Sequence, residues 1–359
     1  VEKSEPVAAY YTSTTESWHA MLDACRNAKK SIELEEFVLH PDKIGKQFIE
    51  TFIEKARQGC QVKLLLDWVG CRQLLPSSLY REMKEAGVQI AWFNPPSWKW
   101  FKFSNIFPRD HRKTLILDKE KAFIGGICIY DKITDWRDTM VLVDNGVVGE
   151  IRHVFDRTWI KATHDKLGEI NAHPDFQNEP QITIHANSPD TDEYNVTDLM
   201  IEKMTQAQSI IRLVTPYFAP SPRFLKALLG ALQRGVRVEI LLADKAERVP
   251  YYLGKRFAAN LAKRGAEIYY YQPFMLHLKT VMVDDRWAAL GSCNLDGLSL
   301  QQNQEIMLTT EHPEVVKNLL QHHREDLTRA TRFTAKDWES VPFYEKIFSR
   351  ILAPMRAYI

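Results

Sequence analysis

Two stretches of the chain repeat apolar residues with the period of an amphipathic helix. The first is predicted to begin after Asp42, a helix-capping residue, and to end at Gly59. The second is predicted to begin at Ser221-Pro222 and to end at Gly235. The apolar stripes consist of Ile44, Phe48, Phe52 and Ala56 in the first stretch and of Phe224, Leu225, Leu228 and Leu232 in the second. We interpret both stripes as core positions.

Continuous apolar runs follow both predicted helices. Residues 62–66 and 236–242 have the length and composition of buried strands. A further apolar segment, which begins with Ile32 and Leu34, precedes the first helix. This strand–helix–strand order is typical of α/β proteins. We therefore expect α/β units with largely parallel sheets.

Four blocks of sequence occur twice, in the same order and about 170–180 residues apart. The second block of each pair echoes the first: AKKSIELEEFVL and AQSIIRLVTPYF, FIEKARQGCQVKLLLD and LLGALQRGVRVEILLAD, EAGVQIAWF and KRGAEIYYY, and HRKTLILDKEKAFIGG and HLKTVMVDDRWAALGS. A repeat of this kind predicts two copies of one structural unit. We expect a first domain at residues 1–165, a polar linker at 166–182, and a second domain at 183–359 that ends in an amphipathic segment.

The overall composition is that of a folded protein without a dominant charge. The 359 residues include 47 lysines and arginines against 46 aspartates and glutamates, a formal net charge of +1. Attraction to nucleic acid or to an anionic membrane must therefore come from local patches. The five cysteines are scattered, which argues against a disulfide framework and favours a reducing compartment. No run of about 18 uninterrupted apolar residues predicts a membrane-spanning helix.

The last pair of blocks carries a polar motif, His-x-Lys-x-x-x-x-Asp, followed after six residues by Gly-Gly or Gly-Ser. The motif residues are His111, Lys113, Asp118 and Gly126 in the first copy, and His277, Lys279, Asp284, Ser292 and Asn294 in the second. A single His-x-Lys pair is typical of an ordinary surface. Two copies that keep the aspartate at the same spacing, while the residues between them change, indicate a function.

The spacing of the motif indicates chemistry on a phosphate. The segments KTLIL and KTVMV look like strands, in which side chains two residues apart point to the same face. One imidazole and one ammonium would then face the same bound phosphate. Lysine would neutralise the phosphate oxygens, and histidine would attack phosphorus or transfer a proton. Asp118 and Asp284 would point to the opposite face, and we interpret them as structural supports.

With its duplicated motif, the sequence resembles the phospholipase D superfamily over nearly its whole length. Finer features resemble bacterial cardiolipin synthases of the short type without N-terminal membrane helices, in the segments AKKSIELEEFVLHPD, RDHRKT, TPYF and GSCNLDGLSLQQNQE. The resemblance implies two similar α/β/α domains with pseudo-twofold symmetry and one active site at their interface. It also implies that the His, Lys and Asp of both motifs form the catalytic set, with no metal and no other cofactor.

Each histidine also needs an acceptor that fixes its tautomer. Asp138 follows His111 by 27 residues and Glu305 follows His277 by 28, and each begins an apolar strand segment. The family has an acidic residue here that holds the imidazole. The alternative is that both are solvated acids at strand edges.

The first copy departs from the family pattern at one position. The family pattern ends in Gly-Gly/Ser-x-Asn, and the second copy keeps Asn294, but the first has Cys128 at the equivalent place. We interpret Cys128 as a small buried residue rather than a catalytic thiol. The change raises the question of how symmetrical the two half-sites are.

The resemblance implies a two-step displacement through a phosphohistidine. By family resemblance, His111 is the nucleophile and His277 protonates the departing alcohol and then deprotonates the incoming one. Lys113 and Lys279, supported by Gly126, Ser292 and Asn294, would hold the phosphoryl oxygens. The order of the two histidines is not fixed by the sequence itself.

An aromatic segment from Trp92 to Pro108 precedes His111 and is mostly missing from the second copy. We expect its centre to contact a membrane surface, through Trp98, Lys99, Trp100, Phe101, Lys102 and Phe103. The alternatives are an insertion that packs on its own domain and a platform on which nucleic-acid bases stack.

The C-terminal stretch from Trp338 to Ile359 has apolar residues at helical spacing among basic ones. It would either lie in a membrane surface or dock on the second domain. The pair His322-His323 is interpreted as a solvated helix face rather than a metal site.

These observations favour a peripheral enzyme of the bacterial inner membrane, on its cytoplasmic face. It would transfer a phosphatidyl group from phosphatidylglycerol to a second phospholipid and so make cardiolipin. The alternatives are a hydrolytic phospholipase D, a phosphatidylserine synthase, a nuclease and a lipid-binding scaffold. The near-neutral charge argues against the nuclease, since nucleases rely on basic grooves. No nucleic-acid partner is expected.

Overall fold

A computed structural model describes residues 7–97, 106–144, 146–164, 182–244 and 248–353. The chain divides into two compact units, Val1–Ile184 and His185–Ile359. The boundary falls within a strand, β8 (Ile182–Ser188). The linker predicted at residues 166–182 lies almost wholly outside the described residues, so its bounds stay a prediction.

The first unit contains a seven-stranded sheet in the order β1-β7-β6-β5-β2-β3-β4. Its strands are β1 (Val7–Ser13), β2 (Ser31–Glu36), β3 (Gln61–Asp67), β4 (Gln89–Phe93), β5 (Thr114–Leu117), β6 (Lys121–Gly125) and β7 (Arg137–Asp144). Only the neighbours β2, β3 and β4 run parallel, and the other pairs are antiparallel.

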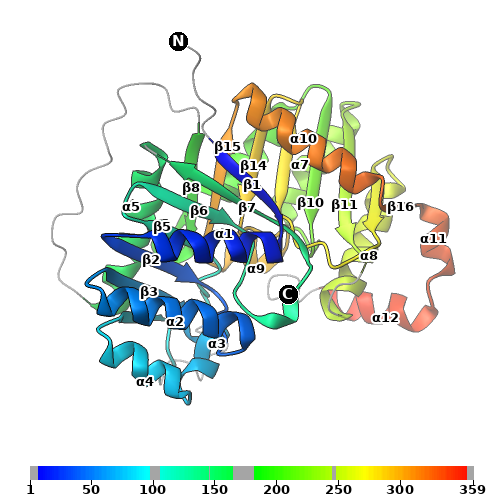
Figure 1. Ribbon diagram of the computed structural model, residues 1–359. Coiled ribbons are helices and arrows are strands. Elements are labelled where there is room, and N and C mark those ends of the chain that lie inside the picture. Colours follow the sequence, from blue (N-terminus) through cyan, green and yellow to red (C-terminus); the bar gives the residue numbers. More distant parts are fainter. Residues whose placement is uncertain (1–6, 98–105, 145, 165–181, 245–247, 354–359) are drawn as a thin grey trace, which may run out of the picture. The chain divides into compact units, whose positions relative to one another are not determined.

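Two layers of helices cover this sheet (Figure 1). The helices of the first unit are α1 (Thr14–Asn27), α2 (Lys43–Arg57), α3 (Trp68–Cys71), α4 (Ser78–Glu85) and α5 (Gly146–Thr163). Ile32 and Leu34 of β2 are buried in the core with α1 and α2. The alternate residue Glu33 meets Arg152 of α5, so α5 covers the other face, as the period of a strand requires.

The second unit contains a nine-stranded sheet in the order β16-β12-β11-β10-β13-β14-β15-β8-β9. Besides β8, its strands are β9 (Glu193–Tyr194), β10 (Ile210–Thr215), β11 (Arg237–Ala243), β12 (Glu267–Tyr271), β13 (Thr280–Val283), β14 (Trp287–Gly291), β15 (Glu305–Thr310) and β16 (Ala330–Phe333). Here too three neighbouring strands, β10, β11 and β12, run parallel, while β13, β14, β15 and β16 each pair antiparallel with a neighbour.

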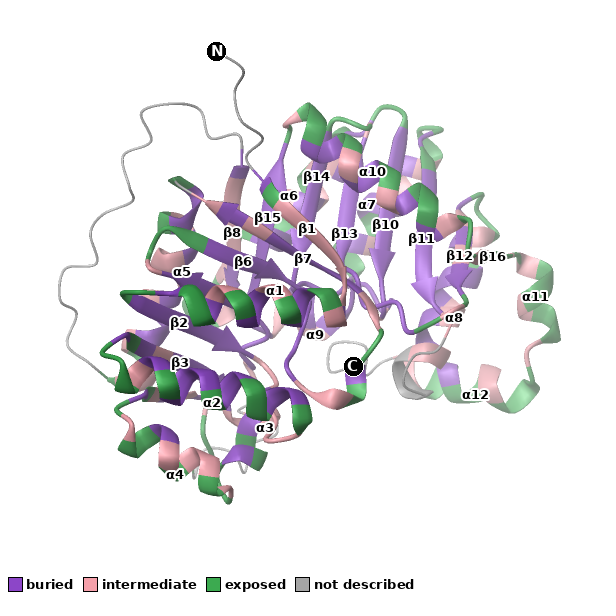
Figure 2. Cartoon of the chain, viewed as in Figure 1, coloured by how far each residue is buried: buried purple, intermediate pink, exposed green. Residues whose placement is uncertain are grey.

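The helices of the second unit repeat those of the first and add a C-terminal pair. They are α6 (Asn195–Gln206), α7 (Pro222–Gln233), α8 (Arg248–Ala262), α9 (Gly297–Gln301), α10 (Pro313–Leu327), α11 (Ala335–Ser340) and α12 (Phe343–Leu352). Within the described ranges, no helix combines the length and the apolar character needed to cross a membrane. The central strands of both sheets are buried nearly throughout, whereas β1, β8, β9 and β16 are mostly half-buried or exposed (Figure 2).

The helix ends predicted from the sequence are confirmed. The side chain of Asp42 accepts a hydrogen bond from the backbone N–H of Gly45 and caps α2, and Gly59 follows the helix at φ +89°. Ser221 caps α7 in the same way, and Gly235 follows that helix at φ +85°. These positive φ values favour glycine, which is why both helices end where they do.

Two expectations about the fold are wrong. The sheets are mixed rather than largely parallel, because tight hairpins join β5 to β6 and β13 to β14. The second error concerns His323, which is buried on α10 with its Nε2 2.6 Å from Glu239 Oε1 rather than lying on a solvated face.

Candidate functional site: two histidine–lysine pairs

Each motif histidine and lysine lies in the extended segment just ahead of a central strand. β5 begins at Thr114 and β13 at Thr280, one residue after the motif lysine in each unit. The expectation that both side chains belong to the strand itself is therefore wrong. The side chains nevertheless gather at one place within each unit. His111 and His277 are 8% and 9% exposed, and both lysines are almost fully buried.

In the first unit, Phe37 connects the two motif side chains. The Phe37 ring lies edge-on to His111, with 4.9 Å between ring centroids. Lys113 Nζ is 5.2 Å from the centroid of the same ring and donates a hydrogen bond to the backbone oxygen of His111. An aromatic face stabilises a buried ammonium without neutralising it. The Lys113 side chain is thus held beside the histidine by the Phe37 ring and the His111 backbone.

In the second unit, lysine and histidine are in direct contact. Lys279 Nζ lies 2.7 Å from His277 Nδ1 and also donates to the backbone oxygen of His277. Tyr217 lies edge-on to His277 at 6.4 Å between ring centroids. Because an ammonium can only donate, His277 Nδ1 accepts in this contact, and a neutral ring then carries its proton on Nε2.

The motif aspartates make structural contacts away from the histidines. The carboxylate of Asp118 accepts from the backbone N–H groups of Lys29, Lys30 and Ser31, at 2.6 to 3.0 Å. Asp284 accepts in the same way from three successive N–H groups at the start of β10, those of Gln208, Ser209 and Ile210. Burial opposes ionisation of both, but these hydrogen bonds outweigh it and lower the pKa of each aspartate below its ordinary value.

The two acids predicted to orient the histidines are buried, so the alternative of solvated strand-edge acids is wrong. Asp138 is 1% exposed at the start of β7, and Glu305 is fully buried at the start of β15. Each lies against the small residue of the motif in its unit. A Cβ on Gly126 would come within 2.5 Å of Asp138 Oδ1, whereas the hydroxyl of Ser292 donates to Glu305 Oε2.

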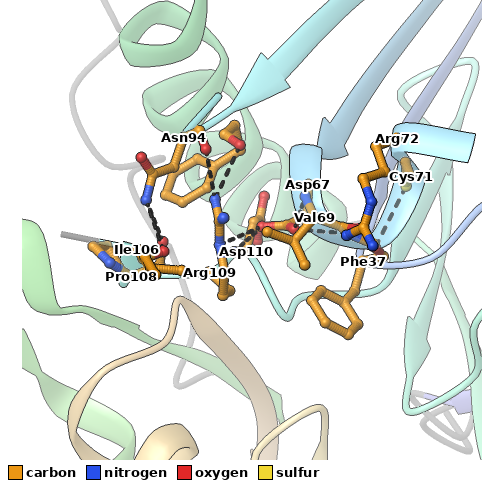
Figure 3. Close-up of polar contacts among 12 residues, drawn as sticks. Phe37, Asp67, Val69, Cys71, Arg72, Asn94, Ile106, Pro108, Arg109 and Asp110 are labelled. Carbon is orange, nitrogen blue, oxygen red and sulfur yellow. Dashed lines mark hydrogen bonds and ion pairs between the residues drawn. The ribbon is translucent and has the colours of Figure 1, made fainter. Parts of the chain in front are cut away.

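A buried polar network holds the segment that leads to His111 (Figure 3). Arg109 Nε lies 3.1 Å from Asp67 Oδ2, and Arg109 Nη2 donates to the backbone oxygen of Asn94 at 2.8 Å. The same Asp67 oxygen accepts from the N–H of Asp110, and its other oxygen caps α3 through Val69. Burial raises the pKa of Asp67 to about 6 despite Arg109.

A second cluster lies around Arg112, under the same segment. Arg112 Nη1 donates to Thr158 Oγ1 at 2.7 Å and lies 3.5 Å from Glu35 Oε1. Burial and the nearby Glu35 raise the pKa of the Asp110 carboxyl well above its usual range, and Arg112 opposes the shift. Together with the Asp67–Arg109 pair, this cluster fixes the backbone on both sides of His111.

The cysteine that replaces asparagine in the first unit faces a buried acid. Glu36 is fully buried at the end of β2, and burial raises its pKa to about 8, although Lys113 and a hydrogen bond with Cys128 oppose the shift. At the equivalent places of the second unit stand Thr215 and Asn294. Cys128 is therefore buried, as expected, and it is the partner of an acid rather than an isolated packing residue.

Sequence reasoning missed several of these residues, chiefly Glu36, Phe37, Asp67, Tyr217 and Asp296. Asp67 and Glu36 each end a strand that the apolar pattern predicts, which is a visible signal. The edge-on contacts of Phe37 and Tyr217 with the histidines join segments distant in the chain, and no local sequence pattern predicts them.

The predicted membrane-contact residues, Trp98 to Phe103, lie outside the described residues. The flank of that segment is structured: Phe93 is buried in β4, and Trp92 Nε1 donates to Tyr80 Oη at 3.3 Å. In the described part of the chain, no group of three or more His, Cys, Asp or Glu side chains is arranged to hold a metal ion.

A duplicated mixed-sheet α/β unit with one histidine–lysine pair per copy defines the class of phospholipase D-like proteins. Residues 21–159 and 200–327 match the family described as "Cardiolipin synthase, PLD-like domain". The chain belongs to this family.

Curated relatives match the chain over most of its length. It is 29% identical to the probable cardiolipin synthase YwiE of Bacillus subtilis, over 92% of this chain and 67% of that protein. It is 30% identical to cardiolipin synthase A of Pseudomonas putida strain KT2440, over 93% of this chain and 71% of the relative. A solved phosphatidylserine synthase from Haemophilus influenzae has the same fold, with a TM-score of 0.76 at 14% identity over 98% of this chain and 93% of that one.

Proposed function

We propose that this chain is a cardiolipin synthase that transfers a phosphatidyl group from phosphatidylglycerol to the glycerol hydroxyl of a second phospholipid. The observation that carries the proposal is the pair of buried histidines, each with a buried lysine beside it, in a chain whose relatives are named cardiolipin synthases. It is an enzyme of the phospholipase D type.

The proposed reaction has two displacements at one phosphorus atom. His111 Nε2 attacks phosphorus, the bond to the headgroup glycerol breaks, and His277 supplies the proton that leaves with the glycerol. The hydroxyl of the second lipid then gives its proton back to His277 and attacks the phosphohistidine. Cardiolipin forms and His111 is released unchanged. Neither step needs water or a redox partner.

The contact between Lys279 and His277 supports this division of roles. With Nδ1 accepting from the ammonium, the neutral ring presents an N–H at Nε2, which is the tautomer of a hydrogen-bond donor and not of a nucleophile. To protonate a leaving oxygen, His277 must first take up a second proton. The imidazolium then repels Lys279 Nζ, which frees the ammonium for a phosphoryl oxygen.

The two lysines supply the positive charge that the transition state requires. Both are almost fully buried, where an ammonium interacts more strongly with phosphoryl oxygens than it would in water. The proposed reaction therefore needs no metal. We propose Asp138 and Glu305 as the residues that orient the histidines, and Ser292 and Asn294 as support for Lys279.

The alternatives differ in what attacks the intermediate. Water would give phosphatidic acid, as in a hydrolytic phospholipase D, and the hydroxyl of serine would give phosphatidylserine. The likeness to the solved phosphatidylserine synthase concerns the fold alone. The lipid-binding scaffold is disfavoured because both histidine–lysine pairs are intact.

Pure protein mixed with vesicles of labelled phosphatidylglycerol tests the proposal. Labelled cardiolipin and free glycerol are expected, without loss of activity in excess EDTA. Addition of phosphatidylethanolamine asks whether it can be the phosphatidyl donor to the hydroxyl of phosphatidylglycerol, in which case ethanolamine is released instead of glycerol. Phosphatidic acid as the sole product would identify a hydrolase, and loss of activity that only a divalent ion restores on zwitterionic vesicles would contradict the metal-free mechanism.

We propose that the enzyme acts as a peripheral protein on the cytoplasmic face of the inner membrane. The phospholipid substrates support the membrane location, and the proposal extends the family membership of the chain. Fractionation of cells, with extraction of the membranes by high salt, tests it. A peripheral protein leaves the membrane in high salt, whereas retention would require a stronger anchor.

A further inference from the structure

The C-terminal helices of the second unit border an open pocket that contains none of the motif residues. α11 and α12 both pack on α8, and the three helices line a cavity of about 240 Å³. Figure 1 shows α12 running beside α8. Four of the lining residues are cationic and none is acidic: the set is Arg256, Ala259, Asn260, Lys263, Trp338, Lys346, Ser349 and Arg350.

The positive charge of this pocket is not balanced from within. Arg256 Nη1 is buried and has no hydrogen-bond partner among the described residues. Burial, and after it the charge of Arg350, lowers the pKa of Arg256. Lys346 Nζ donates to the backbone oxygen of Glu339 and lies 5.9 Å from the Trp338 ring centroid. A guanidinium of intermediate exposure whose buried Nη1 has no acceptor, next to like charges, favours an anion with several acceptor oxygens.

Helix α12 also exposes apolar side chains to solvent. Phe343 is 77% exposed, Tyr344 69% and Ile351 65%. Phe348, by contrast, lies edge-on to Tyr252 of α8 at 5.8 Å between ring centroids, so α12 is docked on the unit and still exposed on one side. Figure 2 shows this exposure along α12. Cationic side chains beside exposed rings and aliphatic groups are typical of helices that lie in a membrane surface.

We propose that this pocket binds the headgroup phosphate of an anionic membrane phospholipid, while Phe343 and Ile351 enter the apolar layer. The inference rests on the proposed function only in taking a phospholipid membrane as the surface on which the enzyme works. The exposed apolar side chains favour a lipid over a nucleic acid, whose backbone would use the cations and leave Phe343 and Ile351 in water. The sequence offered two alternatives for the C-terminal stretch, docking on the second domain or contact with a membrane. Under this proposal helix α12 does both.

Co-sedimentation with vesicles tests the proposal independently of catalysis. All proteins carry His111→Ala and His277→Ala, so that turnover cannot change the vesicles. The pocket variant adds Arg256→Gln, Lys263→Gln and Arg350→Gln. A charge-matched control adds Lys226→Gln, Arg286→Gln and Lys317→Gln, which are exposed residues elsewhere on the second unit. Vesicles contain phosphatidylcholine alone or with phosphatidylglycerol.

The pocket variant should bind the phosphatidylglycerol vesicles at least tenfold more weakly than the parent, because three cations near an anionic surface are lost. The control should lose less than threefold, and binding to pure phosphatidylcholine should not change. A Phe343→Gln, Ile351→Gln variant should bind both kinds of vesicle more weakly.

Equal losses in pocket variant and control would overturn the proposal, because general charge would then explain the binding. Unchanged vesicle binding with weaker binding to single-stranded DNA would assign the pocket to nucleic acid and also overturn it. Should the pocket variant melt at a lower temperature than the parent, Lys263→Gln with Arg350→Gln, both at exposed side chains, repeats the test. Because the readout is binding, its failure is distinct from a failure to make cardiolipin.

Discussion

The two units keep the same histidine–lysine pair but support it by different means. Ahead of His111 the chain has Arg109 and Asp110, which are tied into buried ion pairs, whereas ahead of His277 it has Met275 and Leu276, which are buried apolar residues. A polar network fixes one segment and side-chain packing fixes the other. The two units therefore share the histidine–lysine pair and a buried acid on a later strand, whereas the residues that hold the segment ahead of the histidine differ.

A buried carboxyl beside the lysine is present in both units, but it comes from different places in the sequence. In the first unit it is Glu36 at the end of β2. In the second it is Asp296, the cap of α9, whose pKa burial raises to about 7 although Lys279 and backbone N–H groups oppose the shift. The residues at the equivalent positions, Thr215 and Tyr130, are not acids. The local electrostatics are thus conserved between the units while the residues that provide them differ.

Removal of either motif lysine should produce the largest effect and test whether both units are required. Lys113→Met and Lys279→Met remove the charge and keep most of the buried volume. Each should lower kcat by about a thousandfold, because a buried donor to a phosphoryl oxygen is lost. Turnover of labelled phosphatidylglycerol measures this. If one variant keeps more than a tenth of the activity, the two units do not share the chemistry.

The polar support of the first unit should be more fragile than the apolar support of the second. Asp67→Asn removes the carboxylate that lies 3.1 Å from the buried Arg109 Nε and should lower the free energy of unfolding by about 3 kcal/mol. Met275→Leu, the matched change in the second unit, should cost less than about 1.5 kcal/mol. Urea unfolding curves of the two variants and the parent measure these free energies. Similar costs for both would show that the two supports are energetically equivalent.

The small motif residues should differ in what their mutation does. Gly126→Ala places a Cβ against the Asp138 carboxylate, within 2.5 Å of Oδ1, so the acid must move. We expect about a hundredfold loss of kcat. Ser292→Ala removes a single hydroxyl that donates to Glu305 and should cost about tenfold. The kcat of the two variants is compared on vesicles of the same composition. An unchanged kcat in Gly126→Ala would mean that the position of Asp138 has no bearing on catalysis.

The buried acids should make the stability of the protein depend on pH. The pKa of Glu36 is raised to about 8 in the folded state from an ordinary value of 4.5, so the folded state binds this proton more tightly than the unfolded chain. Its contribution to stability is therefore full at low pH and is lost as the pH rises from about 4.5 to 8.

Glu36→Gln imitates the protonated acid and should flatten that part of the pH profile of the unfolding free energy. Asp296→Asn should flatten the same profile at lower pH, between the ordinary pKa of an aspartate, 3.8, and the raised pKa of Asp296, about 7. Unfolding curves recorded between pH 4 and pH 9 provide the measurement. A slope in the Glu36→Gln protein equal to that of the parent would mean that Glu36 is ionised in the folded state.

Much of the fold could be predicted because its signals are local. Asp42 and Gly59 mark the ends of α2, and the repeated blocks predict two copies of one unit. The hairpin from β5 to β6 was missed although its turn is short, and two consecutive residues there, Asp118 and Lys119, have positive φ. The βαβ rule covers only the first half of each unit, so it overestimates the parallel pairs.

Only those site residues could be predicted that belong to the motif segment or follow it at a fixed spacing in the sequence. His111, Lys113 and the acid on the next strand follow from spacing. The burial of His323 does not, because it depends on Glu239 in the distant strand β11. The same limit applies to Phe37, whose ring reaches His111 from another part of the chain. Contacts of this kind depend on how distant segments pack, and the periodicity of apolar residues in the sequence does not predict that packing.

The central claim is that the two histidines have separate roles on one phosphoryl group. Intact-protein mass spectrometry after mixing with phosphatidylglycerol tests it most directly. In the His277→Asn protein we expect a phosphatidyl adduct on His111 that forms slowly and persists, and in the His111→Ala protein we expect no adduct. An adduct on His277 in the His111→Ala protein would reverse the assignment. A cardiolipin-forming enzyme without a covalent adduct in any variant would contradict the mechanism itself.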